Sequence, residues 1–112
     1  MKKVDFGQTI PAVDGRIMQE RFIEDGEAKE RDLTLRAACT FVLARDVDND
    51  EQTVNQRLDR IILALKIRGA TKPVDISIDE AKTIKDRAEL LPDTWLMAMI
   101  HLMIEGTYEQ AR

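Results

Sequence analysis

The feature that most constrains the fold is a run of apolar residues over 95–104, in which His101 is the only polar side chain. The run predicts a helix that is apolar nearly all the way round, capped by Asp93 or Thr94 and ended by Gly106. Such a helix must be covered on every side, and a chain of 112 residues has little to cover it with. The helix is therefore either the centre of the core or a contact surface for another protein.

Size and composition favour a soluble, globular single domain over residues 1–112. A formal charge of −4 argues against broad binding to nucleic acid or to a membrane surface, since both need a basic face. The apolar run is about half the roughly 20 residues that a membrane span requires. Cys39 is the only cysteine, so no internal disulfide can form, which fits a reducing cytoplasm.

The first part of the chain predicts a small β-hairpin followed by a loop. Residues 4–6 alternate apolar and polar, as a half-buried strand does. Asp14-Gly15 is a turn signal, and residues 16–23 could form the returning strand. Residues 24–32 are mostly charged and are expected to be an exposed loop.

Two helices are predicted in the middle of the chain. The first begins with Asp32 or Thr34 as its N-cap. The second begins with Thr53 and Gln56 at the spacing of a capping box. Apolar residues at helical spacing predict a core-facing side for each helix. These are Leu35, Ala38, Cys39 and Val42 in the first, and Val54, Leu58, Ile61, Ile62 and Leu65 in the second.

A short strand at residues 73–76 could join the hairpin, and a second capping box, Ser77 and Glu80, opens a third helix. The inner face of this helix is predicted to be Ile78, Ala81, Ile84, Ala88 and Leu91. The fold class is therefore α+β, mostly α: a four-helix domain with a small N-terminal β-hairpin. Within the single domain we expect hairpin and loop over 1–32, helices over 33–106 and a frayed tail over 107–112.

The spacing of Asp46, Asp48 and Asp50 resembles the opening of a calcium-binding loop. The remainder of that motif is absent, because Glu51 stands where glycine makes the sharp turn and Arg57 stands where a glutamate binds the ion. We therefore expect a solvated loop between helices and no functional metal.

His101 and Cys39 are single residues of their type, and two residues do not make a zinc site. We expect His101 at the edge of a mostly buried helix, with its polar tip reaching solvent or a backbone carbonyl. Cys39 is expected to behave as a small buried hydrophobe rather than a nucleophile. No catalytic residue and no cofactor site are predicted.

The final helix carries the predicted contact surface. One face can pack on the other helices, which leaves the second face without a cover, so both core and interface remain open for this helix. Methionine is flexible and polarizable and suits adaptable contacts. The residues predicted to meet a partner or a second copy are Trp95, Met97, Met99, Ile100, Met103 and Ile104.

Four stretches resemble small proteins of tailed bacteriophages and prophages: residues 33–35 (LTL), 57–67 (RLDRIILALKI), 74–85, and the proline-led apolar helix from residue 91 onward. Together they cover most of the chain, although the last helix is richer in methionine than that pattern. The resemblance implies a phage origin, action in the cytoplasm of an infected bacterium or in the virion, and no enzymatic role.

From the residues and the resemblance together we expect a non-enzymatic protein that acts by protein–protein contact, in virion assembly or in modulation of a host protein. The partner would be a second copy of the chain or a phage or host protein, with no membrane involved. The alternative is a small nucleic-acid-binding regulator, disfavoured by the acidic charge and by the long segment between the first two helices. A small enzyme is disfavoured by the scarcity of histidine and cysteine.

Overall fold

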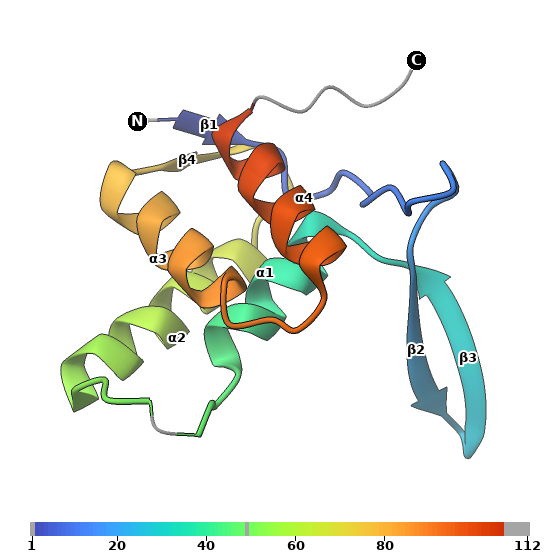
Figure 1. Ribbon diagram of the computed structural model, residues 1–112, viewed down its shortest axis with the longest axis horizontal. Coiled ribbons are helices and arrows are strands. Elements are labelled where there is room, and N and C mark those ends of the chain that lie inside the picture. The colour runs from blue at the N-terminus through green and yellow to red at the C-terminus, as the bar shows by residue number, and fades with distance from the viewer. Residues whose placement is uncertain (1, 49, 107–112) are drawn as a thin grey trace.

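The computed structural model describes residues 2–48 and 50–106, and the tail predicted over 107–112 lies outside this part. Within it the chain forms four helices and two antiparallel strand pairs (Figure 1). The helices are α1 (Leu35–Ala44), α2 (Val54–Arg68), α3 (Ile78–Ala88) and α4 (Thr94–Glu105). The strands are β1 (Lys2–Val4), β2 (Gln19–Glu24), β3 (Glu27–Asp32) and β4 (Val74–Ile76). The predicted class, α+β with four helices, is confirmed.

Local sequence sets the helix boundaries. Thr34 caps α1 by accepting a hydrogen bond from the backbone N–H of Ala37, and Asp93 caps α4. Both predicted capping boxes are present, at the start of α2 and of α3, so the first backbone N–H groups of these helices are satisfied. Gly106 ends α4 with a φ of 74°, a conformation that glycine adopts without steric cost.

Helix α1 lies at the centre of the molecule and packs against α2, α3 and α4 (Figure 1). Its predicted inner face is confirmed, since Leu35, Ala38, Cys39 and Val42 are all buried. The prediction for α3 is correct for Ile84 and Ala88, which are buried, and wrong for Ile78, which is 84% exposed. Ile78 is the first residue of α3, whereas the buried residues of this helix, Ile84, Arg87 and Ala88, all lie in its second half.

The predicted strand pairing of the N-terminal hairpin is wrong. Strand β1 pairs with β4, not with residues 16–23, and the pairs run from Lys2 with Ile76 to Val4 with Val74. Asp14-Gly15 does form a turn, because the Gly15 N–H donates to the carbonyl of Ala12. This turn connects no strands, only the isolated β-bridge between Pro11 and Ile17. The buried side chains of Val4 and Ile76 hold this strand pair against the core.

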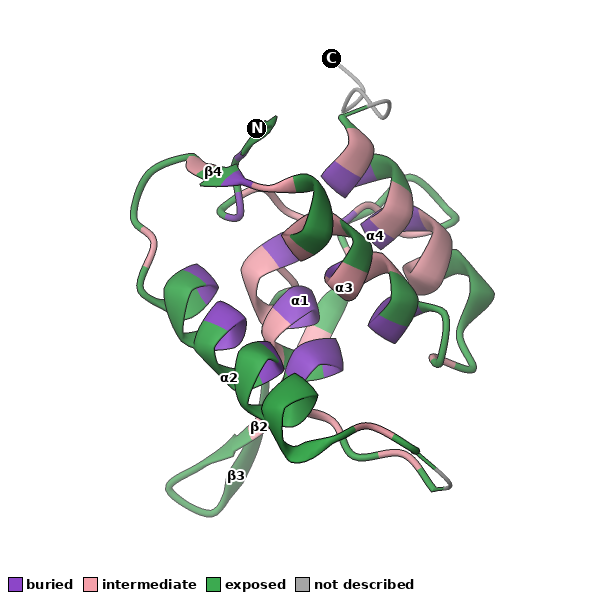
Figure 2. Cartoon of the chain, turned by 90° about the vertical axis from the view of Figure 1, so that its left-hand side faces the viewer, coloured by how far each residue is buried: buried purple, intermediate pink, exposed green. Residues whose placement is uncertain are grey.

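The hairpin that does form is made of β2 and β3, with Asp25-Gly26 as its two-residue turn. Both turn residues have positive φ, 52° and 78°, as a tight hairpin turn requires. Residues 24–32, predicted to be a loop, are therefore largely strand. Unlike β1 and β4, the hairpin projects away from the helices and is exposed along nearly its whole length (Figures 1 and 2).

Helix α4 belongs to the core. Met99, Ile100, Met103 and Ile104 are at most 4% exposed and pack in one cluster with residues of α1 and α3. These four residues were predicted to meet a partner, and that prediction is wrong for them, because the chain's own helices cover this side of α4. Of the predicted contact residues, Trp95 and Met97 keep part of their surface exposed.

Candidate functional site

The largest departure from expectation is on α2. Its five apolar residues at helical spacing point to solvent, not to the core, with exposed fractions of 40% to 68%. This set of residues, here named the apolar stripe, consists of Val54, Leu58, Ile61, Ile62 and Leu65. Monomeric proteins scatter single apolar residues over their surface, whereas a continuous row of this kind marks an interaction site.

Helix α2 has a second apolar side, and this one faces the core. Leu63, Ala64 and Ile67 are buried against α1, and Arg60 is buried beside them. At about 100° per residue these positions lie on the opposite side of the helix from the apolar stripe. Helix α2 stands at the edge of the helical layer, so its inward side is buried and its outward side is exposed (Figure 2).

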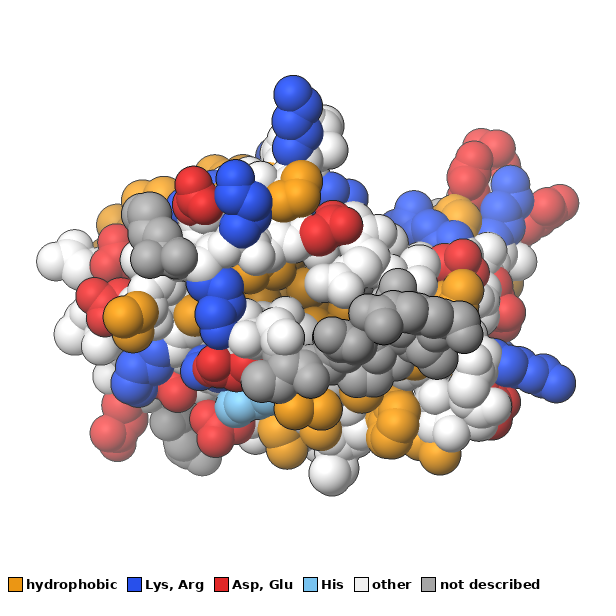
Figure 3. All heavy atoms as spheres, turned by 90° about the horizontal axis from the view of Figure 1, so that it is seen from above, with side chains coloured by type: hydrophobic (Ala, Val, Ile, Leu, Met, Phe, Trp, Pro, Cys, Tyr) orange, Lys and Arg blue, Asp and Glu red, His pale blue; other side chains and the backbone are white. Residues whose placement is uncertain are grey.

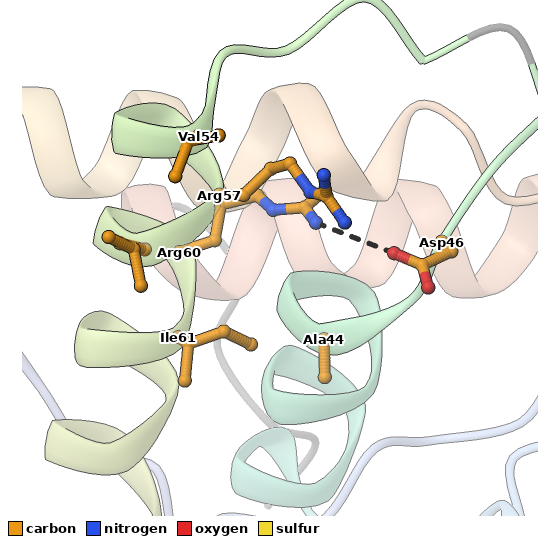
Figure 4. Close-up of a pocket in the computed structure, with 7 residues that line it drawn as sticks. Ala44, Asp46, Val54, Arg57, Arg60 and Ile61 are labelled. Atoms are coloured by element: carbon orange, nitrogen blue, oxygen red, sulfur yellow. Dashed lines mark ion pairs between the residues drawn. The ribbon is translucent and has the colours of Figure 1, made fainter.

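A depression of about 460 Å³ lies between the end of α1 and the first half of α2 (Figure 4). Ala44 forms the α1 side, and Val54, Leu58 and Ile61 of the apolar stripe form the α2 side. Arg57, Arg60 and Asp46 supply its polar rim. The depression gives the stripe a concave, partly charged edge at its N-terminal end.

Three charged residues fix α2 in this orientation. Asp50 accepts hydrogen bonds from Arg60 at 3.3 Å and from Arg87 of α3 at 2.7 Å through the same carboxylate oxygen. Arg87 also donates to the backbone carbonyl of Arg45 at 2.8 Å. The hydrogen bond from Arg87 and the two positive charges hold the pKa of Asp50 below its usual range. Because both guanidinium groups are buried, removing their shared partner would leave Arg87 inside the protein without a carboxylate and Arg60 with Asp46 alone, at 3.9 Å.

The side chains most able to carry chemistry have structural roles. The carboxylate of Asp50 is already bonded to two arginines, and no three His, Cys, Asp or Glu side chains in residues 2–48 and 50–106 are placed to hold a metal ion. His101 Nε2 lies 3.2 Å from the carbonyl oxygen of Lys85, which confirms the predicted contact with a backbone carbonyl. Cys39 is fully buried, as predicted, and burial raises the pKa of its thiol well above the usual range.

The β2–β3 hairpin is a second exposed feature, and it is held by polar contacts. Arg21 pairs with Glu30 at 3.1 Å and Arg31 with Glu20 at 2.8 Å across the strands. The Arg31 guanidinium also lies 4.5 Å from the ring centre of Phe22. Seen from above, acidic and basic side chains lie next to each other where the hairpin projects (Figure 3). Charges of both signs along the edges discourage pairing with further strands.

Trp95 is the predicted contact residue with the clearest structural role. Its indole Nε1–H donates to the carbonyl oxygen of Pro11 at 2.7 Å, which ties the start of α4 to the N-terminal segment. The structure therefore does not bring the six predicted contact residues together as one exposed surface. The exposed apolar row is instead on α2. The helical spacing of its residues identifies them as one face of the helix, but that spacing does not show whether the face points to the core or to solvent.

Comparison of the chain with protein-family models, curated proteins and solved structures gives no match. In the part of the chain that the structure describes, no helix is long and apolar enough to cross a membrane.

Proposed function

We propose that this chain is a non-enzymatic protein that acts by contact with other protein surfaces, in phage virion assembly or in modulation of a host protein. The observation that carries the proposal is the apolar stripe of α2. Leaving Leu58 and Ile62 more than half exposed forgoes the free energy that their burial would release, roughly 25 cal/mol for each Å². Covering the stripe with a protein partner recovers that free energy.

The surroundings of the stripe fit a protein partner better than a nucleic acid. Of the four basic residues of α2, Arg60 is paired with Asp50, and Lys66 with Glu80 at 3.1 Å. This leaves Arg57 and Arg68 as the only two without an ion pair among the residues that the structure describes. A nucleic-acid surface needs a group of free positive charges to neutralise phosphates. A gel-shift experiment at low salt separates the two functions, because the protein-contact proposal expects no shift.

The proposal is tested by the same substitution at two exposed isoleucines. Ile62 of the stripe is 63% exposed and Ile78 of α3 is 84% exposed, so Ile62→Glu and Ile78→Glu place an identical charge on different surfaces. Proteins retained from bacterial cells by the tagged chain would be identified, purified and mixed again with each variant. We expect a reconstituted complex that survives Ile78→Glu and is lost with Ile62→Glu. The proposal would be contradicted if both variants bound every reconstituted partner equally well and also associated with themselves equally well.

A further inference from the structure

The apolar stripe has the spacing of a coiled-coil contact. Val54, Leu58, Ile61 and Leu65 are separated by four, three and four residues, which places them alternately at the two core positions of a seven-residue repeat. Ile62 widens the contact on one side. A row with this spacing matches another helix that carries the same row, and it extends for about 16 Å at 1.5 Å per residue.

The charges at the two ends of the stripe decide the direction of pairing. The charged residues that flank the stripe are Glu51, two residues before the N-cap Thr53, and Arg68 in the last turn of α2. Both residues are exposed, and neither has an ion-pair partner among the residues that the structure describes. A parallel pair of α2 helices would set like charges together at each end. An antiparallel pair brings the end of one helix that carries Glu51 close to the end of the other that carries Arg68, twice.

We infer that the chain forms a two-fold dimer in which the α2 helices of two copies pack antiparallel through the apolar stripe. In this arrangement Val54 meets Leu65 of the second copy, and Leu58 meets Ile61. Antiparallel packing also places the N-terminal end of each helix dipole beside the C-terminal end of the other. The inference rests on the proposed contact function and names the partner as a second copy of this chain.

The size of the surface sets the strength of the dimer. A standard stable interface buries roughly 800 Å² on each partner. One row of five side chains, each already 32% to 60% covered by its own chain, supplies less than that. The dimer is therefore expected to be weak, to form at high micromolar concentration and to dissociate on dilution.

Charge exchange tests the dimer by analytical ultracentrifugation of the purified chain. Glu51→Arg and Arg68→Glu each create two like-charge contacts in the dimer, so each should raise the dissociation constant by roughly 3- to 10-fold. The double variant restores opposite charges and should return to within about two-fold of the wild type. Melting curves check that all three variants fold. A double variant that dimerises no better than the single variants would overturn the pairing.

Cysteine cross-linking tests direction independently. A chain carrying Val54→Cys mixed with a chain carrying Leu65→Cys should yield a disulfide-linked dimer, and Val54→Cys alone should not, since the two copies of residue 54 would lie about 16 Å apart along the helix. Buried Cys39 should not react. Efficient cross-linking of Val54→Cys to itself would overturn the antiparallel arrangement.

The outcome also separates this inference from the proposed function. A chain that stays monomeric at high micromolar concentration, yet loses a reconstituted heterologous partner through Ile62→Glu, overturns the dimer and keeps the contact function. A chain that neither dimerises nor loses any partner through Ile62→Glu overturns both.

Discussion

Helices α2 and α4 are both rich in large apolar residues, and the fold uses them in opposite ways. Ile100 of α4 is 0% exposed, whereas Ile62 of α2 is 63% exposed. Helix α4 has α1 and α3 packed against it, but among the other helices α2 packs mainly against α1. The number of neighbouring elements, not the number of apolar residues, decides which helix is buried.

Helix α2 has apolar residues on two sides, and only one of these sides is buried. On α2 the inward side is small and irregular, with Leu63, Ala64 and Ile67, while the regular apolar stripe is outside. A stripe that is cleanly amphipathic can therefore be the side that meets a partner, because partner binding and core packing impose the same spacing.

The largest effect is expected from truncating the buried helix. Ile100→Ala removes a fully buried side chain of α4 and should cost roughly 2–5 kcal/mol of unfolding free energy. A domain of this size has about 5–15 kcal/mol to lose, so the variant should melt much earlier or fail to fold. Urea unfolding followed by circular dichroism measures the loss. A loss below about 1 kcal/mol would place Ile100 at the surface and break the comparison.

A matched pair of leucines on one helix sharpens the comparison. Leu63 is 5% exposed and Leu65 is 50% exposed, so Leu63→Ala should cost roughly 2–5 kcal/mol and Leu65→Ala less than about 1 kcal/mol. The helical spacing, which places Leu65 on the core-facing side, would instead give the large cost to Leu65→Ala. Both free energies would be measured on dilute, monomeric protein, and equal costs would show that α2 is rotated about its axis relative to this structure.

Asp50→Asn tests the contact that orients α2. The variant leaves Arg60 and Arg87 without their shared carboxylate and should melt below the wild type at pH 7. Since the pKa of Asp50 is lowered in the folded protein, its stabilisation is present above the ordinary carboxyl pKa of about 3.9 and is lost as pH falls through the lowered value. The two melting temperatures should therefore converge in acid. A difference that is constant from pH 7 down to pH 2 would rule out the ion pairs as its cause.

The smallest global effect is expected in the hairpin. Gly26 has a φ of 78°, so Gly26→Ala strains the turn and should loosen β2 and β3. Because the hairpin is not packed against the core, the unfolding free energy of the body should change by less than about 0.5 kcal/mol. Amide exchange should accelerate over residues 20–31 alone. Faster exchange in α1 or α4 would show that the hairpin supports the core.

Helix boundaries were predictable because the signals are local. Thr53 with Gln56, and Ser77 with Glu80, satisfy the first N–H groups within one turn and need no tertiary information. The antiparallel pairing of β1 with β4 was not predictable as a hairpin, because it joins strands from distant parts of the chain.

Strand β3 was missed for a different reason. Its residues are mostly charged and have low strand propensity, so composition indicates a loop. Asp25-Gly26 was the available signal, since this dipeptide favours a two-residue hairpin turn, and the opposite charges of Arg21 and Glu30 face each other across it. The candidate site was also predictable only in part. The helical spacing identifies the apolar stripe, but its outward direction depends on the opposite side of α2, where buried Arg60 pairs with Asp50.

Hydroxyl-radical footprinting, read residue by residue by mass spectrometry, tests the central claim most directly. In dilute folded protein, Met99 and Met103 of α4 should be protected although methionine is easily oxidised, whereas Leu58 and Ile62 of α2 should be modified. Raising the concentration should protect Leu58 and Ile62 without changing the two methionines. Rapid oxidation of Met99 and Met103, with Leu58 and Ile62 protected at every concentration, would contradict the assignment of core and contact surface.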